Sequence, residues 1–316
     1  MNLKVELAPK AKRGLLLSNP VMTASGTFSY GLEIGRAYDL AELGAIVSKG
    51  TTLHPRRGNP QPRTWETPAG MLNAIGLQNI GVEAVIREMA PLWARWRVPV
   101  IVNIAGETVE EFAELAARLD AVPAVSGLEV NIGCPNARAG GLEFSADPEQ
   151  AAAVTRGVVT STSLPVIVKL SPLVTDMVAT ARAVAAAGAD ALCVANTVPA
   201  MAIDIHRRRH ALAWGQGGLS GPAIKPIALR LVYRVAGAVD IPVIGCGGIA
   251  TGEDAIEFLM AGATAVQVGT ASFFNPRAPW DILEGVRDFL ARESVEEIGD
   301  IIGAAHLDGP QSKALV

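Results

Sequence analysis

The feature that most constrains the fold is a recurring unit: a glycine, a short apolar run, and an amphipathic segment. Three copies echo one another, at Leu43–Thr51, Ala187–Thr197 and Ala261–Thr270, each with Gly-Ala before its apolar run. The runs are continuously apolar instead of alternating, which is typical of parallel strands covered on both faces. The pattern therefore predicts an α/β fold in which strands and helices alternate.

Eight such units in this chain fit a (β/α)₈ barrel, whose usual length is about 250 residues. A doubly wound open sheet is the alternative for the same alternation. No linker-like segment divides the chain, so we expect one domain over residues 1–316, with a hairpin of Leu3–Leu7 and Leu15–Leu17 below the barrel. The expected strands are Leu17–Ser25, Ala45–Lys49, Val98–Ala105, Gly127–Ile132, Val166–Ser171, Ala191–Asn196, Pro242–Gly245 and Ala265–Gly269.

Two connections are too long for ordinary turns, Thr51–Asn79 and Val198–Pro222. Long loops in compact domains usually carry function. Both follow expected strands, so they should lie at the C-terminal face of the barrel, where barrel enzymes have their active sites.

The residues at the C-terminal ends of the expected strands should converge on that face. Six ends offer a polar side chain and two offer glycine backbone, which predicts a flat, hydrogen-bonding ligand that carries an anionic group. These residues are Ser25, Lys49, Asn103, Asn131, Lys169, Asn196 with Thr197, Gly247 with Gly248, and Gly269 with Thr270.

A phosphate site is expected at the last two strand ends, in Ile244–Gly252 and Gly269–Thr270. Glycine-rich turns that lead into helices offer backbone amides to a phosphate, and barrels often bind phosphate there. Gly245–Ala250 also matches a dinucleotide G-x-G-x-x-A pattern, but no acidic residue follows about 20 residues later to bind a ribose. We interpret the segment as a mononucleotide phosphate site; glycines needed only for tight turns are the alternative.

Lys49 and Lys169 each end an apolar strand, and a buried lysine is costly unless it is paired. One interpretation is a structural salt bridge for each. In the other, one lysine faces a ligand carboxylate and the other faces the electron-rich end of a cofactor ring.

Cys134 follows the strand Gly127–Ile132 and precedes Pro135 and a glycine-rich loop. On a loop its thiol can exchange protons, and with no histidine beside it a general acid or base role fits better than a resting nucleophile. The alternative is a small buried hydrophobe, which is how we interpret Cys193 and Cys246.

Charge and cysteine content exclude several classes of function. The formal net charge is −4 without a sustained basic tract, which argues against a nucleic-acid partner, and His206–His210 is interpreted as a solvated face. The apolar runs are too short to cross a bilayer and the N-terminus lacks signal-peptide features, so we expect a cytoplasmic protein. Three cysteines are too few for a disulfide framework or an iron–sulfur cluster, and we expect no metal.

Four motifs together resemble the dihydroorotate dehydrogenases, most closely the NAD-linked class 1B catalytic subunits, over about residues 1 to 290. They are Asn131–Asn136 with Gly140-Gly141, Asn73–Leu77, Gly217–Ala223 and Ile244–Gly248. The resemblance implies a (β/α)₈ barrel with FMN at its mouth. The implied FMN contacts are Ser25, Lys49, Gly50, Asn103, Asn131, Lys169, Ala195, Gly221, Gly247, Gly248, Gly269 and Thr270.

The resemblance also implies the substrate, dihydroorotate, and its oxidation to orotate in pyrimidine biosynthesis. Cys134 would take the proton from ring carbon five while hydride leaves carbon six for the flavin, and Lys169 would stabilise the reduced ring. The implied substrate contacts are Lys49, Asn73, Ala74, Ile75, Gly76, Leu77, Asn131, Asn136, Asn196 and Thr197.

Electrons would pass to NAD through a partner subunit that bears FAD and a 2Fe–2S cluster, in a heterotetramer built on a dimer of this chain. The alternatives are a class 1A-like, fumarate-linked enzyme and an FMN barrel that reduces another pyrimidine, including uridine in tRNA. A non-redox barrel, such as an aldolase, an isomerase or a binding protein, is the alternative from another class.

Overall fold

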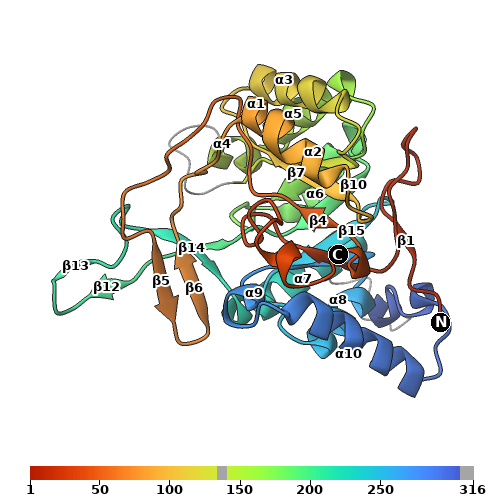
Figure 1. The fold of residues 1–316 in the computed structure, drawn as a ribbon. Coiled ribbons are helices and arrows are strands. Elements are labelled where there is room, and N and C mark those ends of the chain that lie inside the picture. The colour runs from red at the N-terminus through yellow and green to blue at the C-terminus, as the bar shows by residue number, and fades with distance from the viewer. Residues whose placement is uncertain (134–140, 307–316) are drawn as a thin grey trace.

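The computed structural model describes residues 1–133 and 141–306. In this part of the chain, eight parallel strands form one sheet in the order β3-β16-β15-β10-β9-β8-β7-β4 (Figure 1). Its edges meet through a parallel bridge between Met22 and Ala45. The predicted barrel is confirmed, and the doubly wound alternative is excluded. The strands are β3 (Val21–Thr23), β4 (Ile46–Val47), β7 (Val100–Ile104), β8 (Gly127–Asn131), β9 (Val166–Leu170), β10 (Ala191–Val194), β15 (Val243–Cys246) and β16 (Ala265–Val268).

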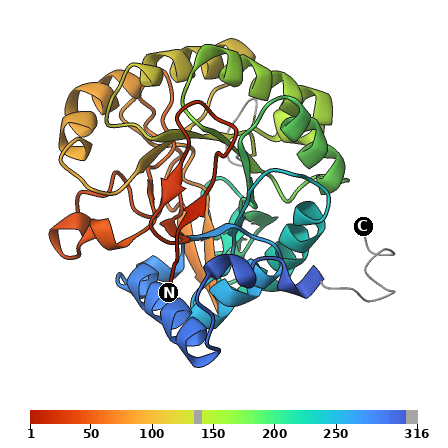
Figure 2. The same ribbon diagram turned by 90° about the vertical axis from the view of Figure 1, so that its right-hand side faces the viewer.

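Helices surround the strands as an outer ring (Figure 2). The first unit differs, because β3 and β4 are joined by the 3₁₀ turns Ile34–Arg36 and Leu40–Glu42. In the described part of the chain, no helix has the length and apolar character needed to cross a membrane. The helices are α1 (Val82–Ala84), which continues through a π turn into α2 (Ala90–Trp93), α3 (Val109–Asp120), α4 (Gly141–Ala146), α5 (Pro148–Ser161), α6 (Met177–Ala186), α7 (Lys225–Ala236), α8 (Gly252–Met260), α9 (Ala271–Phe274) and α10 (Ala278–Arg292).

The barrel strands are buried on both faces, as their apolar runs predict. Every residue of β7, β8 and β9 is buried. The strands are shorter than expected: the run Leu17–Ser25 contributes only Val21–Thr23 to the barrel. The N-terminal hairpin is confirmed, also with shorter strands, as β1 (Val5–Glu6) and β2 (Leu16–Leu17).

The two long connections fold together into a second, antiparallel sheet. The first supplies β5 (Thr64–Thr67) and β6 (Gly70–Asn73), and the second supplies β11 (Val198–Ala200) and β14 (Gly217–Ser220), in the order β11-β14-β6-β5. The hairpin of β12 (Ile203–Asp204) and β13 (Arg209–His210) extends beyond it. Figures 1 and 2 place these strands at the end of the barrel opposite the N-terminal hairpin.

Candidate active site

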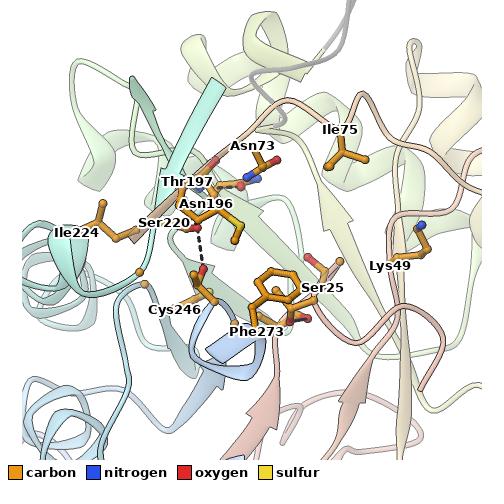
Figure 3. A pocket seen from close by; sticks show the side chains of 18 of the residues that line it. Ser25, Lys49, Asn73, Ile75, Asn196, Thr197, Ser220, Ile224, Cys246 and Phe273 are labelled. Carbon is orange, nitrogen blue, oxygen red and sulfur yellow. Dashed lines mark hydrogen bonds between the residues drawn. The ribbon is translucent and has the colours of Figure 1, made fainter. Parts of the chain in front are cut away.

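A cavity of about 340 Å³ lies between the C-terminal ends of the barrel strands and the antiparallel sheet. Residues from distant parts of the chain face it (Figure 3). The structure brings most of the predicted site residues to its wall. These are Ser25, Lys49, Gly50, Asn73, Ile75, Gly76, Leu77, Asn103, Asn131, Lys169, Ala195, Asn196, Thr197, Gly221, Gly247, Gly248, Gly269 and Thr270.

The other three predicted residues are not among those that line the cavity in the described part of the chain. Ala74 is fully buried in a small cluster with Leu72 and Leu212, and its predicted substrate contact stays a prediction. Successive residues of an extended segment point to opposite sides, and Asn73 and Ile75 take the cavity side. Cys134 and Asn136 lie outside the described residues.

Lys169 forms the floor of the cavity together with Ser25 and Asn103. Its ammonium Nζ lies 2.9 Å from Gln267 Oε1, 3.4 Å from Ser25 Oγ and 3.5 Å from Glu129 Oε1. Burial acts to lower the pKa of Lys169, but the Cys193 and Cys246 sulfurs and the Glu129 carboxylate outweigh it and raise the pKa above its ordinary value. The floor therefore presents a fixed positive charge. The salt-bridge interpretation of Lys169 is confirmed by its ion pair with Glu129, and the cofactor-facing interpretation stays a prediction.

Lys49 differs from Lys169 in its surroundings. It lines the cavity and is half-buried, and no ion pair within the described part of the chain includes it. Burial lowers the pKa of Lys49, and the nearby positive charge of Arg63 lowers it further. The structural salt bridge considered for Lys49 is absent from the described residues, which leaves its charge available to an anionic ligand.

Carboxamides gather on one wall, where the ends of β8 and β10 meet the antiparallel sheet. Asn196 Nδ2 donates to Asn131 Oδ1 at 3.1 Å, and the Asn196 carbonyl oxygen Oδ1 accepts from the Thr197 backbone amide at 2.8 Å. Figure 3 shows Asn73 beside Asn196 and Thr197. A carboxamide carries both donors and an acceptor, so this wall suits a ring with alternating amide N–H and carbonyl groups.

Fewer backbone amides are available to a phosphate than the sequence pattern indicated. Asp254 accepts hydrogen bonds from the amides of Ala250 and Thr251, both at 2.9 Å, in a capping box at the start of α8. Those two amides are therefore already used. The remaining candidates are the amides of Gly247 and Gly248, whose φ angles are +131° and +80°, and those at Gly269 and Thr270. The Thr270 hydroxyl is 2.7 Å from Ser220 Oγ, the contact drawn in Figure 3.

Sequence reasoning missed several groups at this site. Cys246, interpreted as packing, lines the cavity; a hydrogen bond with Cys193 is the largest influence that lowers its pKa, to about 7. Glu129 and Gln267 lie beneath the floor, and a readable signal was present, because each is a polar residue inside an apolar strand. Further lining residues from the two long connections and from α9 include Met71, Gln78, Ser220, Ile224 and Phe273.

A parallel barrel with a cavity at its C-terminal mouth defines a class of (β/α)₈ enzyme. Glycine amides at one side of this cavity, and a buried ammonium group with carboxamides at the other, suit a phosphorylated cofactor and a small anionic ring. The dihydroorotate dehydrogenase family model matches residues 9–290, and the chain belongs to this family. The resemblance seen in the four sequence motifs is thereby confirmed.

Individual relatives agree with the family match. The dihydroorotate dehydrogenase B (NAD(+)) catalytic subunit of Geobacter sp. (strain M21) is 55% identical over 94% of this chain and 97% of that protein. The subunit of the same name from Trichlorobacter lovleyi is 57% identical, over 92% and 95% of the two chains. The crystal structure of DHODH in complex with ferulenol from Eimeria tenella has the same fold, with a TM-score of 0.80 at 21% identity, covering 97% of this chain and 89% of that one.

Proposed function

We propose that this chain is the catalytic subunit of an NAD⁺-linked dihydroorotate dehydrogenase and oxidises dihydroorotate to orotate with FMN. The observation that carries the proposal is the cavity itself. It gathers the residues of the family motifs at the mouth of the barrel, and the relatives aligned over most of the chain are named as this subunit.

The residues around the cavity fit FMN. Gly247 and Gly248 line the cavity with positive φ, and their backbone amides are the proposed phosphate donors. A side chain at Gly248 is not tolerated in this turn, since its Cβ would lie 2.6 Å from the Lys225 amide nitrogen. Lys169 supplies a buried positive charge suited to the electron-rich edge of the flavin ring. Donors and acceptors at Ser25 and Asn103 complete the floor.

The chemistry then divides among this chain's own residues. When bound, FMN would supply the acceptor for the hydride at carbon six of dihydroorotate. Lys49 binds the substrate carboxylate, and the carboxamides of Asn73, Asn131 and Asn196 bind the ring amides. Cys134 takes the proton from carbon five, and Lys169 provides the positive charge that favours the reduced ring.

The electrons leave through a partner, which we propose to be an FAD and 2Fe–2S subunit that joins a dimer of this chain in the cytoplasm. Phe273 lies at the cavity wall yet is 54% exposed, and the next residue, Phe274, is 62% exposed. Exposed neighbouring aromatic side chains often mark a protein interface, and this pair lies where electrons could leave the cavity.

The proposal is tested by purifying the chain from its native host. We expect a yellow protein whose flavin absorbance bleaches when dihydroorotate is added without oxygen, and an iron–sulfur flavoprotein that co-purifies with it. A colourless protein that takes up no FMN would favour a non-redox barrel. Return of the flavin colour when fumarate is added to the dihydroorotate-reduced protein, with no co-purifying subunit, would point to the class 1A-like alternative.

Lys49 gives the reaction a pH dependence on its alkaline side. A free lysine has a pKa near ~10.4, and burial lowers that of Lys49. The charged form, which binds the substrate carboxylate, is therefore lost at a lower pH than for an exposed lysine. We expect the KM for dihydroorotate to rise with pH through that lowered pKa. In Lys49→Arg the side chain stays charged, so the KM should be higher but independent of pH over the same range. An unchanged alkaline rise in that variant would exclude Lys49 as its cause.

A further inference from the structure

Glu129 is a carboxylate inside the barrel, beneath the cavity and not on its wall. It lies in the middle of β8, its side chain is 0% exposed, and the strand register pairs it with Ile167 on one side and Asn103 on the other. An apolar residue of similar volume at a buried ionic position is often no less stable. Stability alone therefore does not account for this carboxylate.

Within the described residues, three donors meet Glu129. Asn103 Nδ2 donates at 2.7 Å, Gln267 Nε2 donates to the second carboxylate oxygen, and Lys169 Nζ lies 3.5 Å away. A carboxylate only accepts hydrogen bonds, so it fixes which way both carboxamides point. It turns the Gln267 carbonyl oxygen toward Lys169, at 2.9 Å.

Asn103 is fixed in the same way. With its amide nitrogen on Glu129, its carbonyl oxygen Oδ1 is turned toward Gly50, where a Cβ would lie 3.2 Å from it. Both Gly50 and Asn103 line the cavity. Glu129 therefore sets two groups of the floor at once: an acceptor at Asn103 and a charged donor at Lys169.

Three titratable groups face Lys169 from the strands around it: Glu129 on β8, Cys193 on β10 and Cys246 on β15. Burial raises the pKa of Cys193 well above its ordinary value. Of these three groups, Glu129 is the carboxylate and the other two are thiols. Glu129 also holds Gln267 against Lys169. Without Glu129, Lys169 loses one of the groups that oppose the effect of burial on its pKa, together with the contact that holds Gln267 against it. Buried lysines can lose their proton near neutral pH.

We infer that Glu129 is a positioning residue that keeps Lys169 charged and Asn103 turned to the cavity, and so prepares the floor to bind the flavin ring. The inference rests on the proposed function. The inference concerns binding of oxidised FMN, whose ring is uncharged. Glu129 lies beneath the cavity and not on its wall, so it acts on the ring through Lys169 and Asn103.

The test measures the dissociation constant of FMN from apoprotein, by quenching of FMN fluorescence, between about pH 7 and about pH 9. The unaltered chain gives the reference profile, because Cys246 also lines the cavity and its pKa is lowered to about 7. Glu129→Gln keeps the side-chain volume but removes the charge, and its affinity should be about tenfold weaker at the lower pH. Its affinity should weaken further as the pH rises, because Lys169 now loses its proton within this range.

Two further variants separate positioning from a general structural effect. In Lys169→Met the additional weakening with pH should vanish. Adding Glu129→Gln to Lys169→Met should then change the FMN affinity by much less than tenfold, because only the effect through Asn103 remains. The double variant also removes the unpaired buried charge, which keeps the test usable if a single variant folds poorly. Asp190→Asn is the matched control: this carboxylate accepts from the Val166 amide at the far end of β9 and should leave FMN binding unchanged.

FMN affinity in Glu129→Gln equal to that of the unaltered chain at every pH would overturn the inference. So would a full tenfold loss in the Lys169→Met background, because none of the effect of Glu129 would then pass through Lys169. Failure of the unaltered apoprotein to take up FMN would instead reject the proposed function.

Discussion

Replacing Cys134 by serine is expected to slow reduction of the bound flavin by dihydroorotate by roughly 10²–10⁴-fold, the usual contribution of a general base. A serine hydroxyl has nearly the same size but is a far weaker base than a thiolate. FMN content should stay normal, because Cys134 is not among the proposed FMN contacts. The measurement is stopped-flow bleaching of the flavin under anaerobic conditions, with dithionite reduction as the check that the flavin itself is unaltered.

The pH profile gives the same prediction a second readout. An unperturbed thiol has a pKa near ~8.5, so the rate of flavin reduction should rise with pH towards that value and level off above it. In Cys134→Ser that rise should disappear.

The controls are the two other thiols. Cys193→Ser retains a donor for Gln267, and its side chain is 0% exposed, so the rate should stay near normal. Cys246 lines the cavity and has a lowered pKa, which makes it the competing base. If Cys246→Ser slowed proton removal and Cys134→Ser did not, the role would pass to Cys246.

The barrel was predictable because short stretches of sequence are enough to identify each of its strands. Continuous apolar runs that end in polar residues specify buried parallel strands, and the C-terminal ends of such strands meet at one face. Eight strand ends could therefore be assigned to one site before any contact was known. The ends themselves were overestimated, as at Leu17–Ser25, because apolar residues beyond Val21–Thr23 pack in the core without joining the sheet.

The antiparallel sheet over the cavity was not predicted, because its pairing joins distant segments. Leu72 on β6 pairs with Leu219 on β14, and nothing in either local pattern identifies the other as its partner. The same limit applies beneath the floor. Glu129 and Gln267 stood out as polar residues in apolar strands, but that they meet Lys169 depends on three strands of the closed barrel.

At the predicted phosphate site, the limit of the sequence is different: it does not show which backbone amides a helix cap already uses. The glycine pattern in Ile244–Gly252 identified a segment that lines the cavity, but it did not show which of its amides were free. Thr251 and Asp254 have the spacing of a capping box, and the cap takes up the amides of Ala250 and Thr251. Helix capping and anion binding compete for the same donors, so a cap signal narrows an anion-site prediction.

Gly248→Val is expected to weaken FMN binding by about 10–10²-fold. The residue has a φ of +80°, which a β-branched side chain rarely adopts, and its Cβ would lie 2.6 Å and 2.7 Å from the Lys225 amide nitrogen and Cα. Lys225 cannot yield easily, because its ammonium group is 2.7 Å from Asp254 and 2.9 Å from Glu257. The strain displaces the Gly248 amide, and a lost hydrogen bond to a charged group costs about 1.5–3 kcal/mol, which corresponds to roughly 10–10²-fold in affinity.

Gly303→Val separates this effect from backbone strain. Gly303 has nearly the same φ, +77°, and nothing lies within 4 Å of a Cβ built on it. Both variants should therefore lose similar stability from the left-handed conformation, while only Gly248→Val loses FMN. The measurements are the dissociation constant of FMN from apoprotein and the melting temperature of each variant. FMN bound equally well by the two variants would show that the phosphate lies elsewhere, and the amides at Gly269 and Thr270 would then be the site to examine, because they are the other glycine-rich strand end at the cavity.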